Sequence, residues 1–240
     1  MIIGIAGKKQ CGKDTICNII RYLDWMKRSE SMEGLVPSAA HFQAIMDNSD
    51  VAPILSIWEK HAWADKLKQC ASIILGADVD CFEEEWFKSS FTTLPLSNEE
   101  GEPMTNREFL QYFGTEVGRA IGKNLWVDSL MQDYHKQFSQ IPEYGISAEG
   151  YRIPISINVV EPCWIIPDTR FPNEADRILD KKGVLIKVER ETGLDDNHPS
   201  EHALDDYKKF TYVINNNGTL QELIDQVIVI MSEIEGSASV

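Results

Sequence analysis

The stretch MIIGIAGKKQCGKDT, residues Met1 to Thr15, decides the fold. It begins with an apolar run, Met1 to Ala6, that is typical of a buried strand, and a helical pattern follows it. Between them, Gly7 and Gly12 allow backbone angles and close approaches that a side chain would block, so successive N–H groups can turn onto phosphate oxygens. The spacing G-x-x-x-x-G-K is that of a phosphate loop. The stretch therefore predicts a strand, a phosphate loop and a helix in an α/β fold.

The lysine at the end of this loop, Lys13, supplies the positive charge of the predicted phosphate site. Lys13 is expected to reach the β and γ phosphates of a nucleotide, and the N-terminus of the helix adds partial positive charge. Asp14 stands where Ser or Thr ordinarily follows the lysine, and Thr15 comes one position later. A carboxylate there can hold Mg²⁺ or act on the acceptor's proton, so the sequence leaves open which of the two residues serves the metal. The residues predicted to bind the donor nucleotide are Gly7, Lys8, Cys11, Gly12, Lys13, Asp14 and Thr15.

Length and charge bound the class of protein. The 240 residues suffice for one α/β domain over residues 1–240, with insertions predicted near 29–50, 78–104 and 140–161. The segment 140–161 is expected to be a loop or a hairpin-like insertion. A formal net charge of −15 argues against a protein that coats duplex nucleic acid, because the phosphate backbone rewards clustered Lys and Arg. The anion site is therefore expected to be local.

The sequence also argues against a disulfide-rich, zinc-binding, membrane-spanning or secreted protein. Five cysteines without paired C-x-x-C spacing indicate neither a disulfide framework nor a zinc site. His198 and His202 lack a third nearby ligand, so we expect a loop and a helix cap there. No apolar run reaches about 18 residues, and no basic segment precedes the first one. We therefore expect neither a membrane span nor secretion, and a cytoplasmic location.

A second strand with a polar end lies further along the chain. The run Cys163–Ile166 is continuously apolar, as a central parallel strand is, and Asp168 follows closely. An acidic residue at this place is expected to give a second Mg²⁺ contact, and Arg170 can bind phosphate bidentately. Asn173 is predicted to cap a helix that runs through Asp180. Glu174, on its first turn, can favour the helix dipole or hold Arg170, and the two roles are compatible.

The remaining elements complete an alternating pattern. Further strands are predicted within Ile54–Trp63, at Val184–Val188 and at Tyr212–Asn215. Helices are predicted at Thr15–Met26, from Ala64 to Leu75, from Thr105 onward, at Leu125–Phe138 and at Thr219–Ile234. This alternation predicts a three-layer α/β fold of the phosphate-loop kinase type, with a parallel sheet of about five strands and helices on both faces.

Other polar residues offer a second binding region. Lys66 and Lys68 fall at a strand-to-helix junction, where open α/β sheets place ligands, although lysines at a helix start also simply solvate it. The helix that starts at the capping box of Thr105 carries polar residues opposite its apolar side. These are Gln111, Thr115, Glu116 and Arg119. Trp126 packs in a core more often than it stacks on a base, and both readings stay open.

Several short motifs lie in order along nearly the whole chain. They are GKDT at Gly12–Thr15, AWADKLK at Ala62–Lys68, LQYFGTE at Leu110–Glu116, Trp126, DTRFPNEAD at Asp168–Asp176, the strand with Arg190, HPSE at His198–Glu201, and VINNNGTL at Val213–Leu220. Together they resemble the deoxynucleoside monophosphate kinases of tailed bacteriophages, a branch of the phosphate-loop kinases. We can place no counterpart of the segments 29–50 and 140–161 in that family.

The resemblance implies transfer of the γ-phosphoryl group of ATP, with Mg²⁺, to a deoxynucleoside monophosphate, giving the diphosphate and ADP. It implies catalytic roles for Lys13, Asp14, Asp168, Arg170 and Glu174, and a metal site among Asp14, Thr15 and Asp168. The acceptor-binding residues that we predict are Lys66, Gln111, Thr115, Glu116, Arg119, Lys123 and Trp126. A phage-encoded enzyme would act in the host cytoplasm, and a homodimer is left open.

Two alternatives remain open at this point. One is a phosphate-loop kinase that acts on a non-nucleotide acceptor, either phosphorylated or bearing a hydroxyl group. The other is a nucleotide-binding module without catalysis, against which the joint presence of Lys13, Asp14, Asp168 and Arg170 argues.

Overall fold

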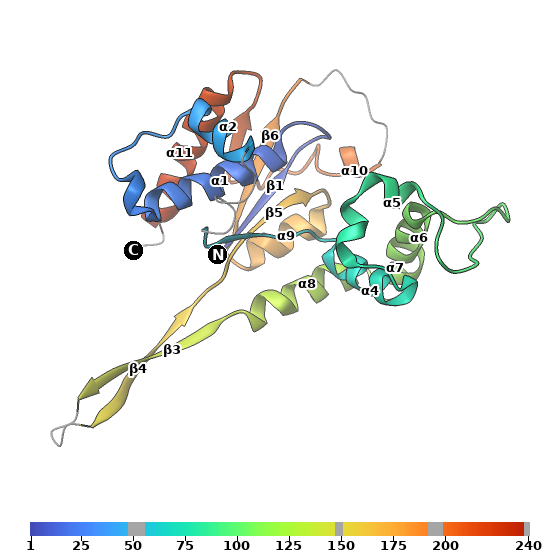
Figure 1. The fold of residues 1–240 in the computed structure, drawn as a ribbon, viewed down its shortest axis with the longest axis horizontal. Coiled ribbons are helices and arrows are strands. Elements are labelled where there is room, and N and C mark those ends of the chain that lie inside the picture. The colour runs from blue at the N-terminus through green and yellow to red at the C-terminus, as the bar shows by residue number, and fades with distance from the viewer. Residues whose placement is uncertain (48–55, 147–150, 192–198, 238–240) are drawn as a thin grey trace. The chain divides into compact units, whose positions relative to one another are not determined.

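The computed structural model describes residues 1–47, 56–146, 151–191 and 199–237 (Figure 1). This described chain divides into two compact units. The first consists of Met1–His61 together with Gln137–Val240, and the second is Ala62–Lys136. The prediction of one domain with insertions stays a prediction.

A parallel sheet forms the centre of the first unit. Among the described residues it has five strands in the order β2-β5-β1-β6-β7, and every neighbouring pair is parallel. The strands are β1 (Ile2–Ala6), β2 (Trp58–Lys60), β5 (Cys163–Thr169), β6 (Val184–Glu189) and β7 (Tyr212–Asn215). All five residues of the central strand β1 are buried, as its apolar sequence predicts. The predicted fold class is thereby confirmed.

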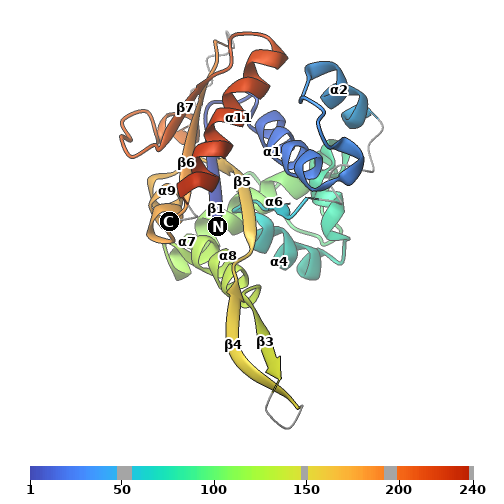
Figure 2. The same ribbon diagram turned by 90° about the vertical axis from the view of Figure 1, so that its left-hand side faces the viewer.

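Helices cover both faces of this sheet (Figure 2). On one face, Ile3 and Ile5 of β1 join a core formed with α1 (Lys13–Arg28) and α11 (Leu220–Ser237). On the other, a Cβ atom on Gly4 would collide with Ile178 of α9 (Pro172–Asp180). Successive residues of β1 therefore face opposite layers, which is the period of a strand buried on both sides.

The segment near 29–50 contains regular secondary structure that the sequence did not predict. It contains the short 3₁₀ turn η1 (Glu30–Met32) and the helix α2 (Ala39–Asp47). Phe42 is buried in the core beside α1, and the backbone N–H of Ala39 donates to the side chain of Gln221 on α11 (2.8 Å). Residues 48–50 of the predicted insertion lie outside the described residues.

The segment near 140–161 forms an antiparallel hairpin. Its strands are β3 (Ser139–Ile146) and β4 (Arg152–Val160), paired from Ser139 with Val160 to Ile146 with Arg152. Of the two forms predicted for this segment, a loop and a hairpin, the structure shows the hairpin. Residues 147–150 lie outside the described residues.

The second unit is helical. It contains α4 (Asp65–Leu75), the 3₁₀ turn η2 (Val79–Glu83), α5 (Glu85–Ser89), α6 (Asn106–Tyr112), the π-helical turn η3 (Phe113–Val117), α7 (Gly118–Ile121) and α8 (Leu125–Lys136). Its core joins Ala71 and Leu75 of α4 to Phe82. The predicted capping box is confirmed, because the hydroxyl of Thr105 accepts from the backbone of Glu108 and the Glu108 carboxylate accepts from the backbone N–H of Thr105 (2.7 Å). Across the described residues, no helix combines the length and apolar character that a membrane span needs.

Candidate active site

The predicted phosphate loop, residues 7–12, joins β1 to α1 in a tightly wound backbone. Gly7 and Gly12 have φ values of 155° and 100°, in the region that favours glycine. A Cβ atom on Gly7 would lie 2.6 Å from the carbonyl oxygen of Val188 on β6, so a side chain there would push the loop away from the sheet. The helix α1 begins at Lys13, which places its N-terminus directly behind the loop.

The side chain of Lys13 folds back over this loop. Its Nζ donates to the carbonyl oxygens of Gly7 (2.7 Å) and Lys8 (2.8 Å). The Sγ atom of Cys11 lies 3.9 Å from the same nitrogen, and burial raises the pKa of this thiol. The lysine cation therefore lies against the loop backbone, at the site predicted for nucleotide phosphates.

A buried asparagine fastens the loop to the sheet. The side-chain amide of Asn216 donates to the carbonyl oxygen of Cys11 (2.7 Å), and its backbone N–H donates to Glu189 at the end of β6 (2.8 Å). Asn216 is 9% exposed. The sequence marks it within VINNNGTL, directly after β7, but it does not predict this contact.

The two predicted carboxylate ligands lie on adjacent segments of the first unit. Asp14 is on the first turn of α1, with its side chain 74% exposed and paired with Lys60 at the end of β2 (2.7 Å). Asp168 is half-buried near the end of β5, where Thr169 lies opposite Ala6 of β1. Both residues therefore belong to the carboxyl edge of the sheet, where open α/β sheets bind ligands. Thr15 is half-buried in the first turn of α1, and the structural role of Lys60 was not predicted.

Glu174 caps the helix that follows β5. Its carboxylate accepts from the backbone N–H groups of Arg170 (2.8 Å) and Phe171 (3.0 Å). The prediction that Asn173 caps this helix is wrong, because the helix begins at Pro172 with Phe171 as its N-cap residue. Proline at the first position needs no N–H partner, and Glu174 satisfies the donors before it. Glu174 therefore lies at the helix start, where it favours the dipole, and it also holds Arg170, by the backbone N–H of that residue.

The environment of Glu174 changes its protonation. The pKa of this carboxyl is raised to about 7, mainly by burial and also by the negative charge of Asp168. The hydrogen bonds from the backbone and the charge of Arg170 act in the opposite direction. Glu174 therefore exchanges its proton near neutral pH, at the edge of the predicted phosphate site.

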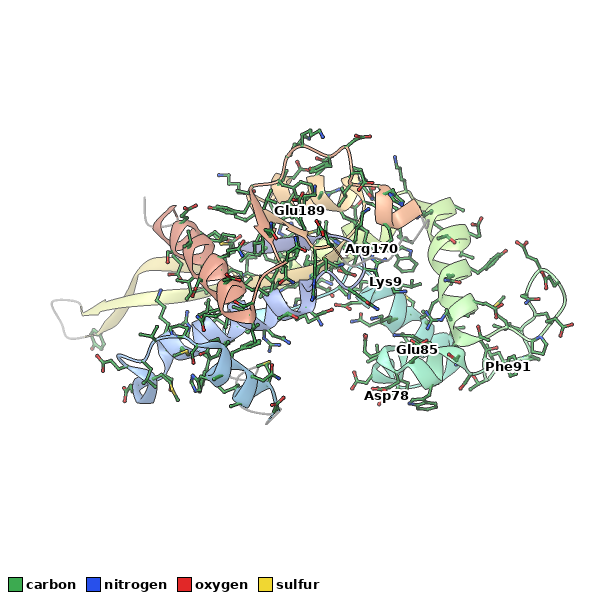
Figure 3. The ribbon with its side chains drawn as sticks, turned by 90° about the horizontal axis from the view of Figure 1, so that it is seen from above. Lys9, Asp78, Glu85, Phe91, Arg170 and Glu189 are labelled. Carbon is green, nitrogen blue, oxygen red and sulfur yellow. The ribbon has the colours of Figure 1, made fainter. Side chains whose placement is uncertain are left out.

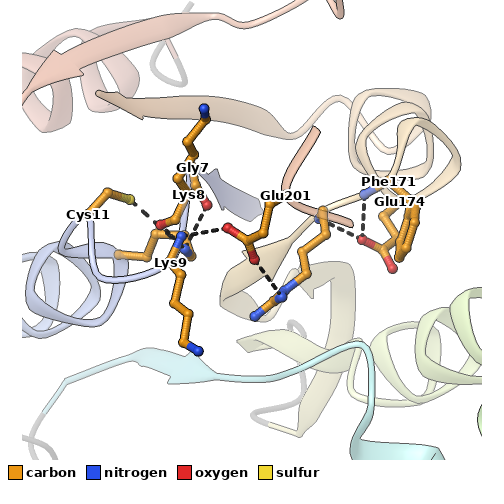
Figure 4. A network of polar contacts seen from close by, with 9 residues as sticks. Gly7, Lys8, Lys9, Cys11, Phe171, Glu174 and Glu201 are labelled. Carbon is orange, nitrogen blue, oxygen red and sulfur yellow. Dashed lines mark hydrogen bonds and ion pairs between the residues drawn. The ribbon is translucent and has the colours of Figure 1, made fainter. Parts of the chain in front are cut away.

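A second carboxylate, from the HPSE segment, joins the loop to Arg170. Glu201 precedes the end of the short helix α10 (Pro199–His202), and its Oε1 accepts from Nη1 of Arg170 (2.9 Å). Its Oε2 accepts from the backbone N–H of Lys9 in the phosphate loop (2.6 Å; Figure 4). The sequence marks the segment but assigns Glu201 no contact, and His198 lies outside the described residues.

A cavity of about 240 Å³ lies beside the loop. Its lining includes Gly7, Lys8, Arg170, Glu189, Arg190 and Glu201. Figure 3 shows Lys9, Arg170 and Glu189, which come from three separate segments of the first unit. The cavity thus brings together the ends of β1, β5 and β6, and its lining carries both cationic side chains and carboxylates.

The predicted acceptor residues all lie in the second unit. Gln111, Thr115 and Glu116 are exposed and line a hollow of about 530 Å³ together with Glu108. Lys66 pairs with Asp133 of α8, and its hydrogen bond is the main cause of a lowered pKa of Asp133. The structure therefore brings part of the set together and engages Lys66 within the unit.

The other three acceptor candidates differ in burial. Arg119 and Lys123 are exposed, whereas Trp126 is half-buried. The indole N–H of Trp126 donates to the carbonyl oxygen of Gly114 in the π-helical turn (2.9 Å), and its ring meets Phe113 edge-on with centroids 5.7 Å apart. These contacts are those of a packing residue, and a role of Trp126 toward a base stays a prediction.

Most of the chain matches one known protein family. Residues 43–227 match the sequence model of the family described as deoxynucleotide monophosphate kinase. The chain belongs to this family. Deoxynucleotide monophosphate kinases are phosphotransferases of deoxynucleotide metabolism, so the resemblance that the motifs indicated is confirmed. The match begins after the phosphate loop, whose assignment therefore depends on its spacing and geometry.

A viral relative is also similar. A protein of Acanthamoeba polyphaga mimivirus that carries the name of a deoxynucleotide monophosphate kinase is 34% identical over 128 residues. The similarity covers 52% of this chain and 60% of the mimivirus protein, so the chain spans less than two thirds of that relative. The relative comes from a giant virus, and a phage origin of this chain stays a prediction.

Proposed function

We propose that this deoxynucleotide monophosphate kinase transfers the γ-phosphoryl group of ATP to the 5′-phosphate of a deoxynucleoside monophosphate. The products are ADP and the deoxynucleoside diphosphate. The observation that carries the proposal is the convergence of the phosphate loop, Lys13 and Arg170 at one edge of the sheet. Family membership supplies the class of acceptor.

The first unit offers the groups that donor phosphates need. The N–H groups of the loop and the N-terminus of α1 bind the β and γ phosphates, and Lys13 exchanges its loop carbonyls for phosphate oxygens. Arg170 meets the transferring group with a planar fork of donors. Phosphoryl transfer depends mostly on positioning and charge neutralisation, so these fixed cations account for much of the rate enhancement.

The residues present fit a magnesium ion. Asp14 and Asp168 offer hard carboxylate oxygens at the same sheet edge, and Thr15 adds a hydroxyl. Within the described ranges, no group of three or more His, Cys, Asp or Glu side chains is arranged to hold a metal. Mg²⁺ in kinases is held by one or two carboxylates together with substrate phosphates, and this donor set suits that mode. Bound there, it would neutralise charge on the phosphate oxygens.

The second unit offers the acceptor residues. Gln111, Thr115 and Glu116 present hydrogen-bonding side chains to one hollow, which suits the edge of a base. The hollow also contains Glu99 and Glu108, so it disfavours phosphate and favours the amino groups of a base. We assign the base of the acceptor to this hollow.

A coupled assay of ADP release tests the proposal. All deoxynucleoside and ribonucleoside monophosphates are offered separately with ATP and Mg²⁺, and Lys13→Ala serves as the matched inactive control. ADP release that requires a deoxynucleoside monophosphate is expected. Release that is indifferent to every nucleotide acceptor would indicate a kinase for another acceptor, and nucleotide binding without release would indicate a module without catalysis.

A further inference from the structure

Glu201 is a buried carboxylate that the proposed reaction does not yet use. Its side chain is 6% exposed, and both of its oxygens accept hydrogen bonds. Oε1 accepts a hydrogen bond from the guanidinium of Arg170, which follows β5. Oε2 accepts one from the backbone N–H of Lys9, inside the phosphate loop. One side chain therefore links the predicted catalytic arginine to the loop that faces the nucleotide.

These contacts are strong enough to fix geometry. Hydrogen bonds to an ionised carboxylate are about twice as strong as neutral ones, and a buried carboxylate that loses its partners leaves an uncompensated charge. Arg170 is held twice, because Glu174 accepts its backbone N–H while Glu201 accepts from its guanidinium. Two carboxylates from separate segments thus restrict both ends of the same residue.

The burial of the pair indicates which partner faces a ligand. The side chain of Arg170 is 42% exposed and lines the cavity beside the loop, whereas Glu201 is nearly covered. Glu201 lines the same cavity and lies between the loop and Arg170, because its two oxygens accept from the backbone N–H of Lys9 and from the guanidinium. It can therefore orient the arginine, whose side chain stays accessible to phosphate.

We propose that Glu201 is a positioning residue for phosphoryl transfer. It aims the guanidinium of Arg170 at the transferring phosphoryl group, and its hydrogen bond from Lys9 fixes the carboxylate in place for that role. This inference rests on the proposed function for the identity of the reaction. It assigns to the HPSE segment a role that acts through Arg170, without contact of Glu201 with the substrate.

Kinetics of single and double variants test the proposal. Glu201→Gln keeps the size of the side chain and removes its charge, so we expect kcat to fall about 10- to 100-fold because the arginine is misplaced. The KM for ATP should change less than about 3-fold, since uniform binding is kept. In an Arg170→Ala background the same change should lower kcat less than about 3-fold, because the residue through which Glu201 acts is gone.

A matched control and two contrary outcomes sharpen this test. Glu235 also pairs with a cation, Lys27 (2.7 Å), but at an exposed site of the first unit, so Glu235→Gln should leave kcat unchanged. Equal losses from Glu201→Gln in both backgrounds would overturn the proposal. Tighter binding of inorganic tripolyphosphate by Glu201→Gln would also overturn it, because the carboxylate would then be a competitor of phosphate.

A spectroscopic measurement keeps the inference separate from the proposed function. In the ¹⁵N spectrum of the wild-type protein, the Arg170 guanidinium should show resolved Nη resonances, because its pairing with Glu201 slows rotation about Nε–Cζ. A freely rotating guanidinium in the wild type would overturn the proposal even if Glu201→Gln failed to fold. If the wild type released no ADP with any nucleotide acceptor, the proposed function would fail while this measurement still decided whether Glu201 holds Arg170.

Discussion

The predicted site residues of the two units are held in different ways. In the first unit, Lys13 and Arg170 contact backbone carbonyls and a buried carboxylate, around a loop whose glycines fix its shape. In the second, Gln111 and Glu116 are exposed on the surface of a helix. Phosphate is the same in every nucleotide and can be bound by backbone N–H groups, whereas a base needs side chains whose identity spacing does not set. Donor sites are therefore easier to recognise than acceptor sites.

The largest expected effect is at the loop lysine. Lys13→Ala should lower kcat about 10³-fold, because the lost cation faces charge that moves between β and γ oxygens. The melting temperature should stay nearly unchanged, since Nζ contacts only loop carbonyls and a sulfur atom. Steady-state kinetics beside thermal melts check this, with the exposed Lys27→Ala as control. A loss of only a few-fold would remove the contrast between the two units.

The counterpart in the second unit is Trp126. Trp126→Ala should lower the free energy of unfolding by about 3 kcal/mol, because it removes a ring packed on Phe113 and the donor to Gly114. The acceptor KM should not change selectively. Urea unfolding and acceptor kinetics measure both, and Trp86→Ala, at a position 66% exposed, should cost less than about 0.5 kcal/mol.

The opposite pattern is equally informative. If Trp126→Ala raised the acceptor KM while the free energy of unfolding and the ATP KM stayed constant, the ring would stack on a base. The predicted acceptor role of Trp126 would then be correct, and the second unit would hold its substrate as rigidly as the first.

The sequence predicts the first unit more fully than the second for physical reasons. Glycine spacing and an apolar strand specify the loop locally, and the register of parallel strands brings Asp168 to the same edge. The contacts of Asn216 and Glu201 join residues about 200 positions apart, and no local pattern encodes such a pairing. Trp126 shows the limit at short range, because the same position on a helix serves packing or stacking equally well.

The predicted metal ligands offer a smaller test. Asp168→Asn should raise the Mg²⁺ concentration needed for half-maximal rate about 10-fold, because it removes one carboxylate from the donor set. Nucleotide binding without metal should be spared, since the loop backbone is untouched. Mg²⁺ titrations of Asp168→Asn and Asp14→Asn measure the two contributions separately. An unchanged Mg²⁺ requirement in Asp168→Asn would assign the metal to Asp14 or Thr15.

The smallest expected effect compares two capping glutamates, one in each unit. Glu174 and Glu108 both accept backbone N–H groups at a helix start, yet their pKa values shift in opposite directions. Burial raises the pKa of Glu174 to about 7, whereas hydrogen bonds from Thr105 lower the pKa of Glu108. The first unit therefore holds its glutamate in a dry site beside Asp168, and the second holds its glutamate beside an open hollow.

This difference predicts the sign of a pH effect. Between the unfolded pKa and about 7, the folded protein binds the proton of Glu174 more tightly than the unfolded chain does, so stability falls as pH rises. From pH 6 to pH 8 this titration should lower the free energy of unfolding by about 1 kcal/mol.

Glu174→Gln removes the titration and keeps a carbonyl oxygen for Arg170 and Phe171. The free energy of unfolding of the variant, relative to that of the wild type, should therefore rise by about 1 kcal/mol between pH 6 and pH 8. Glu108→Gln is the control, because a lowered pKa leaves Glu108 ionised throughout this range and its difference from wild type should be flat. Urea unfolding at pH 6, 7 and 8 measures all three proteins, and a flat difference for Glu174→Gln would mean that its carboxyl is solvated like that of Glu108.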